Sequence, residues 1–234
     1  MKKFALTAGI SLFLSLLVSE QAKAADFTFN PTVTFEVIDG GFPPNSFDGL
    51  GDEVFPGNFD TVVLGDIGEA AEFAEFNISG FSIPPLESIT SAIFQATSPP
   101  NEVFGLGASG QRPTSLAVRG YVGNGLVDAS DFQAGTILDS VNVSPNFVQE
   151  TYNFDVTAFI QNLVNNGDSF AGFGIRAQND IGGLLLDRGT FSGNGPRLII
   201  TTALITPTVP EPSTSFGFLA FSALGMGSLL KRKQ

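Results

Sequence analysis

Short apolar runs separated by turn-forming residues constrain the fold of this chain more than any other feature. Each run holds four to twelve residues rich in Val, Ile, Phe or Thr, and Gly, Pro, Asn or Asp lies between neighbouring runs. The runs span residues 27–38, 61–64, 72–78, 88–96, 115–122, 137–143, 149–154, 171–177, 183–186 and 197–203. Nine or ten short strands predict an all-β chain folded as one antiparallel β-sandwich or barrel.

Two of these runs indicate how their residues alternate between the faces of a strand. Residues 27–38 alternate between apolar and polar side chains and predict one strand. Within residues 72–78, Phe73 and Phe76 are out of strict alternation, which suggests a β-bulge.

One stretch has a helical period instead. Its apolar residues follow the spacing i, i+3, i+4, i+7, i+8: Val156, Phe159, Ile160, Leu163 and Val164. The spacing predicts a short helix near residues 156–166. We expect Asp155 or Thr157 to cap its start and Gly167 to end it.

The first 24 residues have the pattern of a secretory signal peptide. Lys2 and Lys3 precede an apolar run over residues 4–18, and Ala22-Lys23-Ala24 fits a small-x-small cleavage site for signal peptidase. The alternatives are a retained anchor and a core helix. Cleavage is favoured because the apolar run is short for a membrane span of about 20 residues. We therefore expect an exported protein whose folded domain covers residues 26–205.

The last residues predict a membrane helix. Residues 213–230 carry no charge, and 18 residues span about 27 Å as a helix, close to the bilayer core of about 30 Å. Lys231, Arg232 and Lys233 follow and are expected to stay in the cytoplasm. The alternative is a core element of the domain, which has no need of a terminal basic cluster. Residues 206–212 form a linker before this 213–234 segment.

The same tail resembles the PEP-CTERM sorting signal. The resemblance covers about 25 residues and has three parts in order: Val209-Pro210-Glu211-Pro212-Ser213, an apolar span with Gly and Ala, and Lys231-Arg232-Lys233. It implies a Gram-negative-type bacterium and recognition by an exosortase-like transpeptidase. It also implies cleavage near Pro210, Glu211 and Pro212, and delivery to the cell surface or to an extracellular polysaccharide matrix.

Charge and missing residue types exclude several functions. Residues 26–206 contain five Arg, no Lys and 21 Asp or Glu, a net charge of 5 − 21 = −16. Nucleic-acid binding and attachment to an anionic membrane surface are therefore not expected. The chain has no Cys and no His, which excludes disulfides, thiolate chemistry, Ser-His-Asp triads and the usual zinc ligands. A carboxylate pair is the remaining route to catalysis, and we expect no enzyme.

A second resemblance covers the domain. The helix region with Phe154-Asp155-Val156-Thr157, then Gly172-Phe173-Gly174-Ile175-Arg176 and Gly195-Pro196-Arg197-Leu198-Ile199-Ile200, is similar to the C-terminal half of DNRLRE-type domains. The residues 76–79 and 83–92 are similar to that family's early hairpin. The resemblance implies a jelly-roll β-sandwich akin to carbohydrate-binding modules. The chain departs from the family in having no Trp, and in having Glu75 and Phe76 where an early basic residue is usual.

Two groups of polar residues are candidate sites. The loop over residues 39–53 offers Asp39, Asp48, Asp52 and Glu53 as oxygen ligands for Ca²⁺, with Asp60 nearby; the alternative is a solvated loop with local Asx turns. The second group consists of Asp128 and Asp131, which either bind a cation or cap a turn; with Asp139 they are also the candidate acids of a glycosidase.

The aromatic residues weigh against a sugar-stacking platform. There are 24 Phe, two Tyr and no Trp, and sugar platforms generally use Trp or Tyr. Tyr121 and Tyr152 are the candidates for such a platform, and core positions explain them equally well. Arg176 and Arg197 lie in expected strands and are predicted to pair with carboxylates.

Three functions remain open from sequence. The first is a non-enzymatic structural or adhesive protein of the surface or matrix, the second a carbohydrate-binding module with a loop-held Ca²⁺. The third and weakest is a carboxylate-based glycoside hydrolase or lyase.

Overall fold

The structure is a computed structural model, and it describes residues 24–40, 47–59, 61–64, 68–99, 111–146, 148–178, 182–189 and 193–205. The apolar N-terminal run, Ala22, the Pro-Glu-Pro motif and the C-terminal basic cluster lie outside these residues. The chain divides into two compact units, Met1–Leu204 and Ile205–Gln234, and the first contains all the strands given below. Among the described helices, none has the length and apolar character that crossing a bilayer requires.

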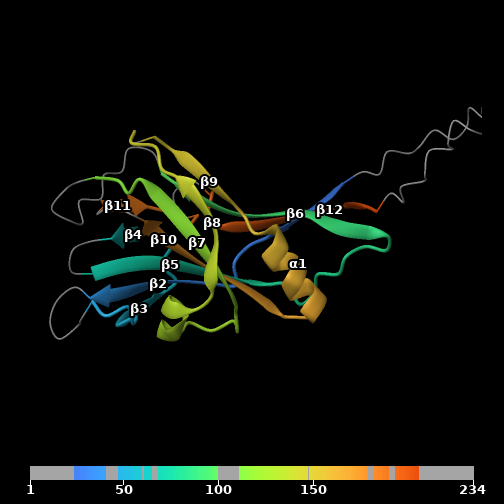
Figure 1. Ribbon diagram of the computed structural model, residues 1–234, viewed down its shortest axis with the longest axis horizontal. Coiled ribbons are helices and arrows are strands. Elements are labelled where there is room, and N and C mark those ends of the chain that lie inside the picture. The colour runs from blue at the N-terminus through green and yellow to red at the C-terminus, as the bar shows by residue number, and fades with distance from the viewer. Residues whose placement is uncertain are drawn as a thin grey trace, which may run out of the picture. The chain divides into compact units, whose positions relative to one another are not determined.

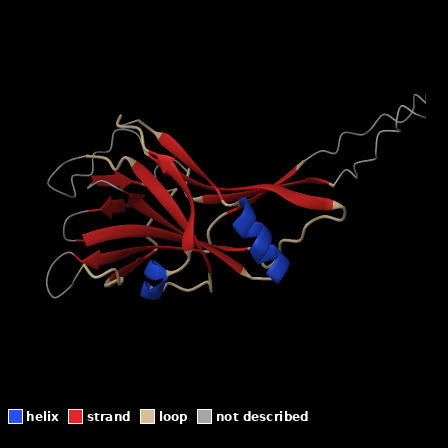
Figure 2. Ribbon diagram, viewed as in Figure 1, coloured by secondary structure: helices blue, strands red, loops and turns tan. Residues whose placement is uncertain are grey.

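Strands make up most of the described domain (Figures 1 and 2). They are β1 (Ala25–Phe29), β2 (Val33–Gly40), β3 (Glu53–Pro56), β4 (Thr61–Leu64), β5 (Gly68–Asn77), β6 (Glu87–Ser98), β7 (Ser115–Val122), β8 (Thr136–Asn142), β9 (Glu150–Asp155), β10 (Phe170–Gln178), β11 (Gly182–Leu185) and β12 (Arg197–Leu204). A 3-10 helix, η1 (Ala129–Gln133), and an α-helix, α1 (Thr157–Asn166), complete the described elements.

The strands form two antiparallel sheets with jelly-roll connectivity. The smaller sheet has the order β1-β12-β6-β9, and the larger contains β5-β10-β7-β8. Eight strands form four nested pairs: β1 with β12, β5 with β10, β6 with β9 and β7 with β8. This is one long hairpin rolled into two sheets, the jelly-roll pattern. The predicted antiparallel β-sandwich with one short α-helix is therefore confirmed.

Four further strands extend the large sheet. β2 pairs with β5 from Gly68 to Glu75 and with β3 on its other side, while β4 pairs with β5 at Glu69 and Ala70 and then with β11. β3 begins at Glu53, a residue expected to lie in the acidic loop. Its partner is Ile38, so β2 and β3 form a hairpin, and residues 41–46 of the predicted loop lie outside the described ranges.

The main core lies between the two sheets and is built around phenylalanine. Phe94 of β6 stacks on Phe173 of β10 with ring centroids 4.7 Å apart, and Phe76 meets both rings edge-on. Ile160 and Leu163 of α1 add to the same cluster. Because these side chains come from both sheets and the helix, they hold the sandwich closed.

A second apolar cluster covers the outer face of the large sheet. It consists of Phe35, Val37, Ala71, Phe73, Tyr121 and Phe132. Phe73 belongs to this outer cluster and Phe76 to the main core. The register of β5 is continuous against both β2 and β10, so the expected bulge is wrong. Both faces of β5 are buried, and a strand of that kind need not alternate.

The single strand expected over residues 27–38 is also wrong. β1 ends at Phe29 and pairs with β12 in the small sheet. β2 begins at Val33 and pairs with β5 in the large sheet. Pro31 lies between them and cannot donate a backbone hydrogen bond, so the ladder ends there.

The helix α1 agrees with its predicted range, with one change at its start. Val156 is the N-cap and makes no side-chain cap bond, whereas Asp155 accepts the N–H of Thr157 at 2.9 Å from one position further back. Gly167 ends the helix with φ = 75°, a left-handed conformation that glycine adopts without strain.

Candidate functional site

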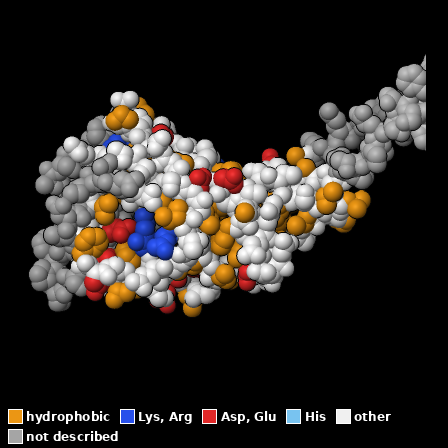
Figure 3. Space-filling view, in the orientation of Figure 1, with side chains coloured by type: hydrophobic (Ala, Val, Ile, Leu, Met, Phe, Trp, Pro, Cys, Tyr) orange, Lys and Arg blue, Asp and Glu red, His pale blue; other side chains and the backbone are white. Residues whose placement is uncertain are grey.

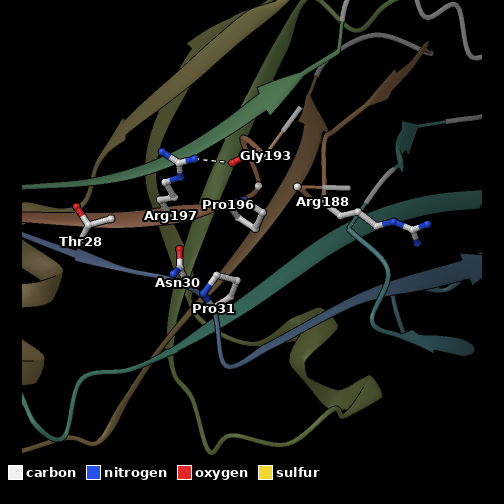
Figure 4. A pocket seen from close by; sticks show the side chains of 9 residues that line it. Thr28, Asn30, Pro31, Arg188, Gly193, Pro196 and Arg197 are labelled. Carbon is white, nitrogen blue, oxygen red and sulfur yellow. Dashed lines mark hydrogen bonds between the residues drawn. The ribbon is translucent and has the colours of Figure 1, made fainter. Parts of the chain in front are cut away.

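The described surface contains an open cleft at one end of the β1–β12 pair. Its volume is about 340 Å³, and it is lined by Thr28, Asn30, Pro31, Arg188, Gly189, Gly193, Gly195, Pro196 and Arg197. Thr28 and Arg197 lie on the outer face of the small sheet, because their neighbours Phe27, Phe29 and Leu198 face the core. Figure 4 shows Thr28, Asn30 and Arg197 on the same side of the cleft, while the side chain of Arg188 points away from Arg197.

Polar groups in this cleft are available to a ligand. The guanidinium of Arg197 donates one bond, from Nη2 to the carbonyl of Gly193 at 2.6 Å, drawn in Figure 4. No side-chain hydrogen bond links Thr28 or Asn30 to another described residue, and both are exposed. The predicted carboxylate partner of Arg197 is therefore wrong. Its strand position leaves its guanidinium at the cleft.

The cleft continues into a row of polar side chains across the small sheet. Arg197 of β12 lies opposite Gln95 of β6, which lies opposite Asn153 of β9. Gln95 Nε2 donates to Asn153 Oδ1 at 2.8 Å. Side chains directly opposite on neighbouring strands lie about 4.5–5.5 Å apart, so this polar row forms a continuous band of hydrogen-bonding groups.

Three other described arginines, away from the cleft, bond within the domain. Arg112 donates to the carbonyl of Ser144 and to the hydroxyl of Tyr152. Arg176 forms the predicted ion pair with a carboxylate, Nη1 to Oε2 of Glu69 at 3.3 Å. Arg119 donates to the carbonyl of Gly135 at 2.7 Å. Figure 3 shows basic side chains next to acidic ones near β5, β7 and β10.

The candidate calcium ligands hold the β2–β3 turn together. Asp39 accepts the N–H groups of Asp48 and Gly49, and Asp52 accepts the N–H of Gly40 at 2.8 Å. Asp48 accepts the N–H of Leu50 two residues on, an Asx turn. Burial raises the pKa of Asp39, against the effect of its backbone donors. Within the described ranges no three acidic side chains converge as a metal site, and calcium at this loop stays a prediction.

The second acidic group splits between two roles. Asp128 caps η1, accepting the N–H of Ser130 at 2.8 Å, as one alternative predicted. Asp131 is buried, and its pKa is raised to about 7 by burial first and then by the charges of Glu75 and Asp128. Asp139 is occupied elsewhere, accepting the N–H groups of Ser140 and Asp155. The structure therefore brings Asp131 toward Glu75, a pairing that the sequence did not indicate.

Neither tyrosine is a platform for a ligand. Tyr121 is 6% exposed and belongs to the outer cluster, and Tyr152 is 2% exposed in the main core. Of the two interpretations left open, the core position is the right one for both.

Sequence reasoning missed Thr28, Asn30, Gln95 and Asn153. Each has a signal in its local pattern, since Thr28 lies between Phe27 and Phe29 and Asn153 between Tyr152 and Phe154. A polar residue between two core residues faces solvent. The sequence does not show which strands are neighbours, so the row could not be assembled from it.

Comparisons with known proteins give fold-level likeness only. No family model matches the chain, and no curated protein matches it. A solved xylan-binding module, CBM15, is 9% identical with a TM-score of 0.37, over 79% of this chain and 99% of the module. The enzymatically active domain of bacteriophage CBA120 tailspike protein 4 is 12% identical with a TM-score of 0.27, over 80% of this chain and 20% of that one. At these values the likeness supports no inference about function, and the resemblances to PEP-CTERM and DNRLRE proteins stay predictions.

Proposed function

We propose that the domain is a non-enzymatic module of the cell surface or extracellular matrix that adheres to a polysaccharide. The observation that carries the proposal is the open cleft. The side chains of Thr28, Asn30 and Arg197 there have hydrogen-bonding groups that no described side chain occupies. Hydroxyl and amide groups both donate and accept, as sugar hydroxyls do, so the two sets of groups complement each other. The polar row through Gln95 and Asn153 extends this surface across the small sheet, so a polymer chain lying along the row meets several polar groups.

Charge favours a neutral polymer. A domain with a net charge of −16 repels polyanions at long range, and Asp26 and Asp155 add carboxylates to the same sheet as the row. The row offers no aromatic ring, so each site is expected to bind weakly. Display of many copies on one surface raises the effective affinity without new contacts.

The position of the cleft suits a protein tethered at its C-terminal end. β12 runs from Arg197, at the cleft, to Leu204, where the described domain ends. The seven steps between these eight strand residues span about 23 Å at ~3.3 Å each. β1 begins beside the same end, since Ala25 pairs with Thr202. The first residue of β1 and the last residue of β12 therefore lie at the end of the sheet opposite to the cleft.

Retention on neutral polysaccharides tests the binding proposal. The full-length protein is passed over insoluble xylan, mannan and glucan, with soluble polygalacturonate as a polyanionic comparison. We expect retention on at least one neutral polymer and a tenfold or greater loss in Asn30→Ala, Arg197→Gln and Asn153→Ala. Asn162→Ala, an exposed change on α1, is the matched control. Equal retention of all variants, or preference for the polyanion, contradicts the proposal.

We further propose export and sorting through the C-terminal tail. Signal peptidase acts near Ala22 and Ala24, and an exosortase-like transpeptidase acts near Pro210, Glu211 and Pro212. The support is the order and spacing of the three tail parts in the sequence. The intact mass of the protein recovered from its host surface is the test. A mass that retains residues 213–234 indicates an ordinary single-span anchor.

Calcium remains a candidate cofactor for the 39–53 loop. Addition of 1 mM Ca²⁺ raises the melting temperature if Asp39, Asp48, Asp52 and Glu53 bind it, and EDTA reverses the rise. A melting temperature unmoved by either indicates that the carboxylates only hold the turn.

A further inference from the structure

The segment between β7 and β8 lies as a strap across the outer face of the large sheet. This strap, residues 123–135, contains η1, the shorter helix in Figure 2. Phe132 of the strap is 1% exposed and joins Phe35 and Val37 of β2 in the outer cluster. The guanidinium of Arg176 lies 3.9 Å from the centre of the Phe132 ring and donates to its carbonyl. The strap is therefore a packed lid on an otherwise flat apolar sheet face.

Three buried polar residues, two on the sheet and one on the strap, lie where the strap packs against the sheet. Glu75 of β5, Tyr121 of β7 and Asp131 of η1 are 0%, 6% and 8% exposed. Each has one oxygen without a well-aligned hydrogen-bond partner: Glu75 Oε1, the Tyr121 hydroxyl and Asp131 Oδ2. The three groups interact electrostatically with one another, and the Tyr121 hydroxyl lies within reach of the Glu75 carboxyl.

Glu75 also ties the strap to the sheet directly. Its other oxygen, Oε2, accepts the N–H of Gly125 at 2.6 Å and that of Asn124 at 3.2 Å. A carboxylate that accepts two backbone N–H groups is stabilised in its charged form. Burial raises the pKa of Glu75 more than these bonds lower it, and the bonds make Glu75 the acceptor that holds the strap.

The number of protons follows from this arrangement. Two buried carboxylates close together cannot both ionise without a large cost. The charges that act on Asp131 are those of Glu75 and Asp128, both negative. One proton on Asp131 removes its repulsion with Glu75, and the phenol proton of Tyr121 is the donor within reach of the Glu75 carboxyl.

We propose that the strap is a proton-dependent clasp, in which a proton on Asp131, buried with Glu75, holds residues 123–135 on the sheet and its loss loosens them. Loosening exposes Phe35 and Phe73, which lie opposite each other on β2 and β5, and Tyr121 on β7. The clasp thereby governs access to an aromatic surface that the closed strap hides.

The pH at which the clasp loosens is set by the groups around it. Burial beside Glu75 and Asp128 raises the pKa of Asp131 to about 7, and burial raises the pKa of Tyr121, so the phenol keeps its proton. Other charges on the same sheet face are paired: Arg176 with Glu69, close to Asp39, and Arg119 with the carbonyl of Gly135. The transition is therefore expected near neutral pH and follows one proton.

Hydrogen exchange at two pH values tests the clasp. The full-length protein is exchanged at pH 5 and pH 8, and amide rates are corrected for intrinsic chemistry. A raised pKa makes opening harder at low pH, so protection of residues 123–135 should fall about ten- to a hundredfold from pH 5 to pH 8. Amides of β6 and β12 in the small sheet should not follow this change.

Variants distinguish a clasp controlled by Asp131 from a general effect of pH on the domain. Asp131→Asn keeps the shape, removes the titration and should give equal strap protection at both pH values. Tyr121→Phe should lower protection at both pH values and keep the pH dependence. Asp168→Asn, a change in the turn after α1, is the matched control. Equal protection of the wild type at pH 5 and pH 8, or an unchanged fall in Asp131→Asn, overturns the proposal. Full protection at pH 8 in 1 mM Ca²⁺ also overturns it, because the cluster then holds a cation.

Discussion

The two sheets of this sandwich present opposite kinds of outer face. On the large sheet, Phe35, Phe73 and Tyr121 point outward and are covered by the strap, which buries acidic groups with them. On the small sheet, the outward positions of the two edge strands are polar and exposed (Asp26 and Thr28 on β1, Thr151, Asn153 and Asp155 on β9), while Ile93 and Ile199 form a half-buried apolar pair between them. Both sheets share one core, so the difference comes only from the residues that alternate with the core positions.

This difference shows how an outer face acquires a role. Apolar outward residues need a cover. A cover over a sheet also removes any polar group beneath it from water, and burying that group costs free energy unless it is hydrogen-bonded. A polar face needs no cover and can meet a ligand. The first kind of face therefore suits a conformational device, and the second suits adhesion.

The largest expected effect tests whether the shared core outweighs either face. Phe173→Ala removes a fully buried ring that contacts Phe76, Phe94 and Phe159. We expect the free energy of unfolding to fall by about 3–5 kcal/mol. Urea denaturation followed by circular dichroism measures it, and a loss below about 1 kcal/mol means that the sheets do not depend on this stack.

The next effect tests the cover of the large sheet. Arg176→Gln removes the ion pair with Glu69 and the bond to the Phe132 carbonyl, and it leaves Glu69 largely buried without its cation. We expect a loss of about 2–4 kcal/mol in the same urea experiment. Glu69→Gln with Arg176→Gln should recover part of it. No recovery in the double variant means that the contact with Phe132 dominates.

The pH dependence of stability tests the buried acids as a group. Desolvation raises the pKa of Asp131, Glu75, Glu69 and Asp39. A carboxyl group with a raised folded pKa stabilises the fold when protonated, and this stability is lost as pH rises through the folded pKa. Melting temperature should therefore fall by several degrees between pH 5 and pH 8. A rise over that range contradicts a net effect of the covered face.

The smallest effect on stability is expected on the open face. Asn153→Ala and Gln95→Ala each remove a solvent-exposed hydrogen bond and no core contact. The free energy of unfolding should change by less than about 0.5 kcal/mol, while polysaccharide retention falls. Urea titration of both variants checks the first part. A large loss of stability would make the row structural and weaken its assignment to binding.

Sequence alone located most of the elements and little of the site. The ranges 61–64 and 115–122 and the helix near 156–166 agree with the structure, because local period and turn residues define them. The joined strand over 27–38 and the bulge at Phe73 failed because each depends on which sheet a residue faces. The sheet that a residue faces depends on strands far away in the chain, whereas the periodicity of a segment shows only how apolar and polar residues alternate within it.

The sequence by itself determined that the domain is an acidic β-sandwich without thiol or imidazole chemistry, and it supplied the predictions for export and sorting. Those conclusions rest on composition and local order, which need no contact map. Only the tertiary structure brought Gln95 between Arg197 and Asn153, and Asp131 of the strap toward Glu75. Residues so far apart in the chain meet through jelly-roll pairing, and pairing depends on the packing of the shared core.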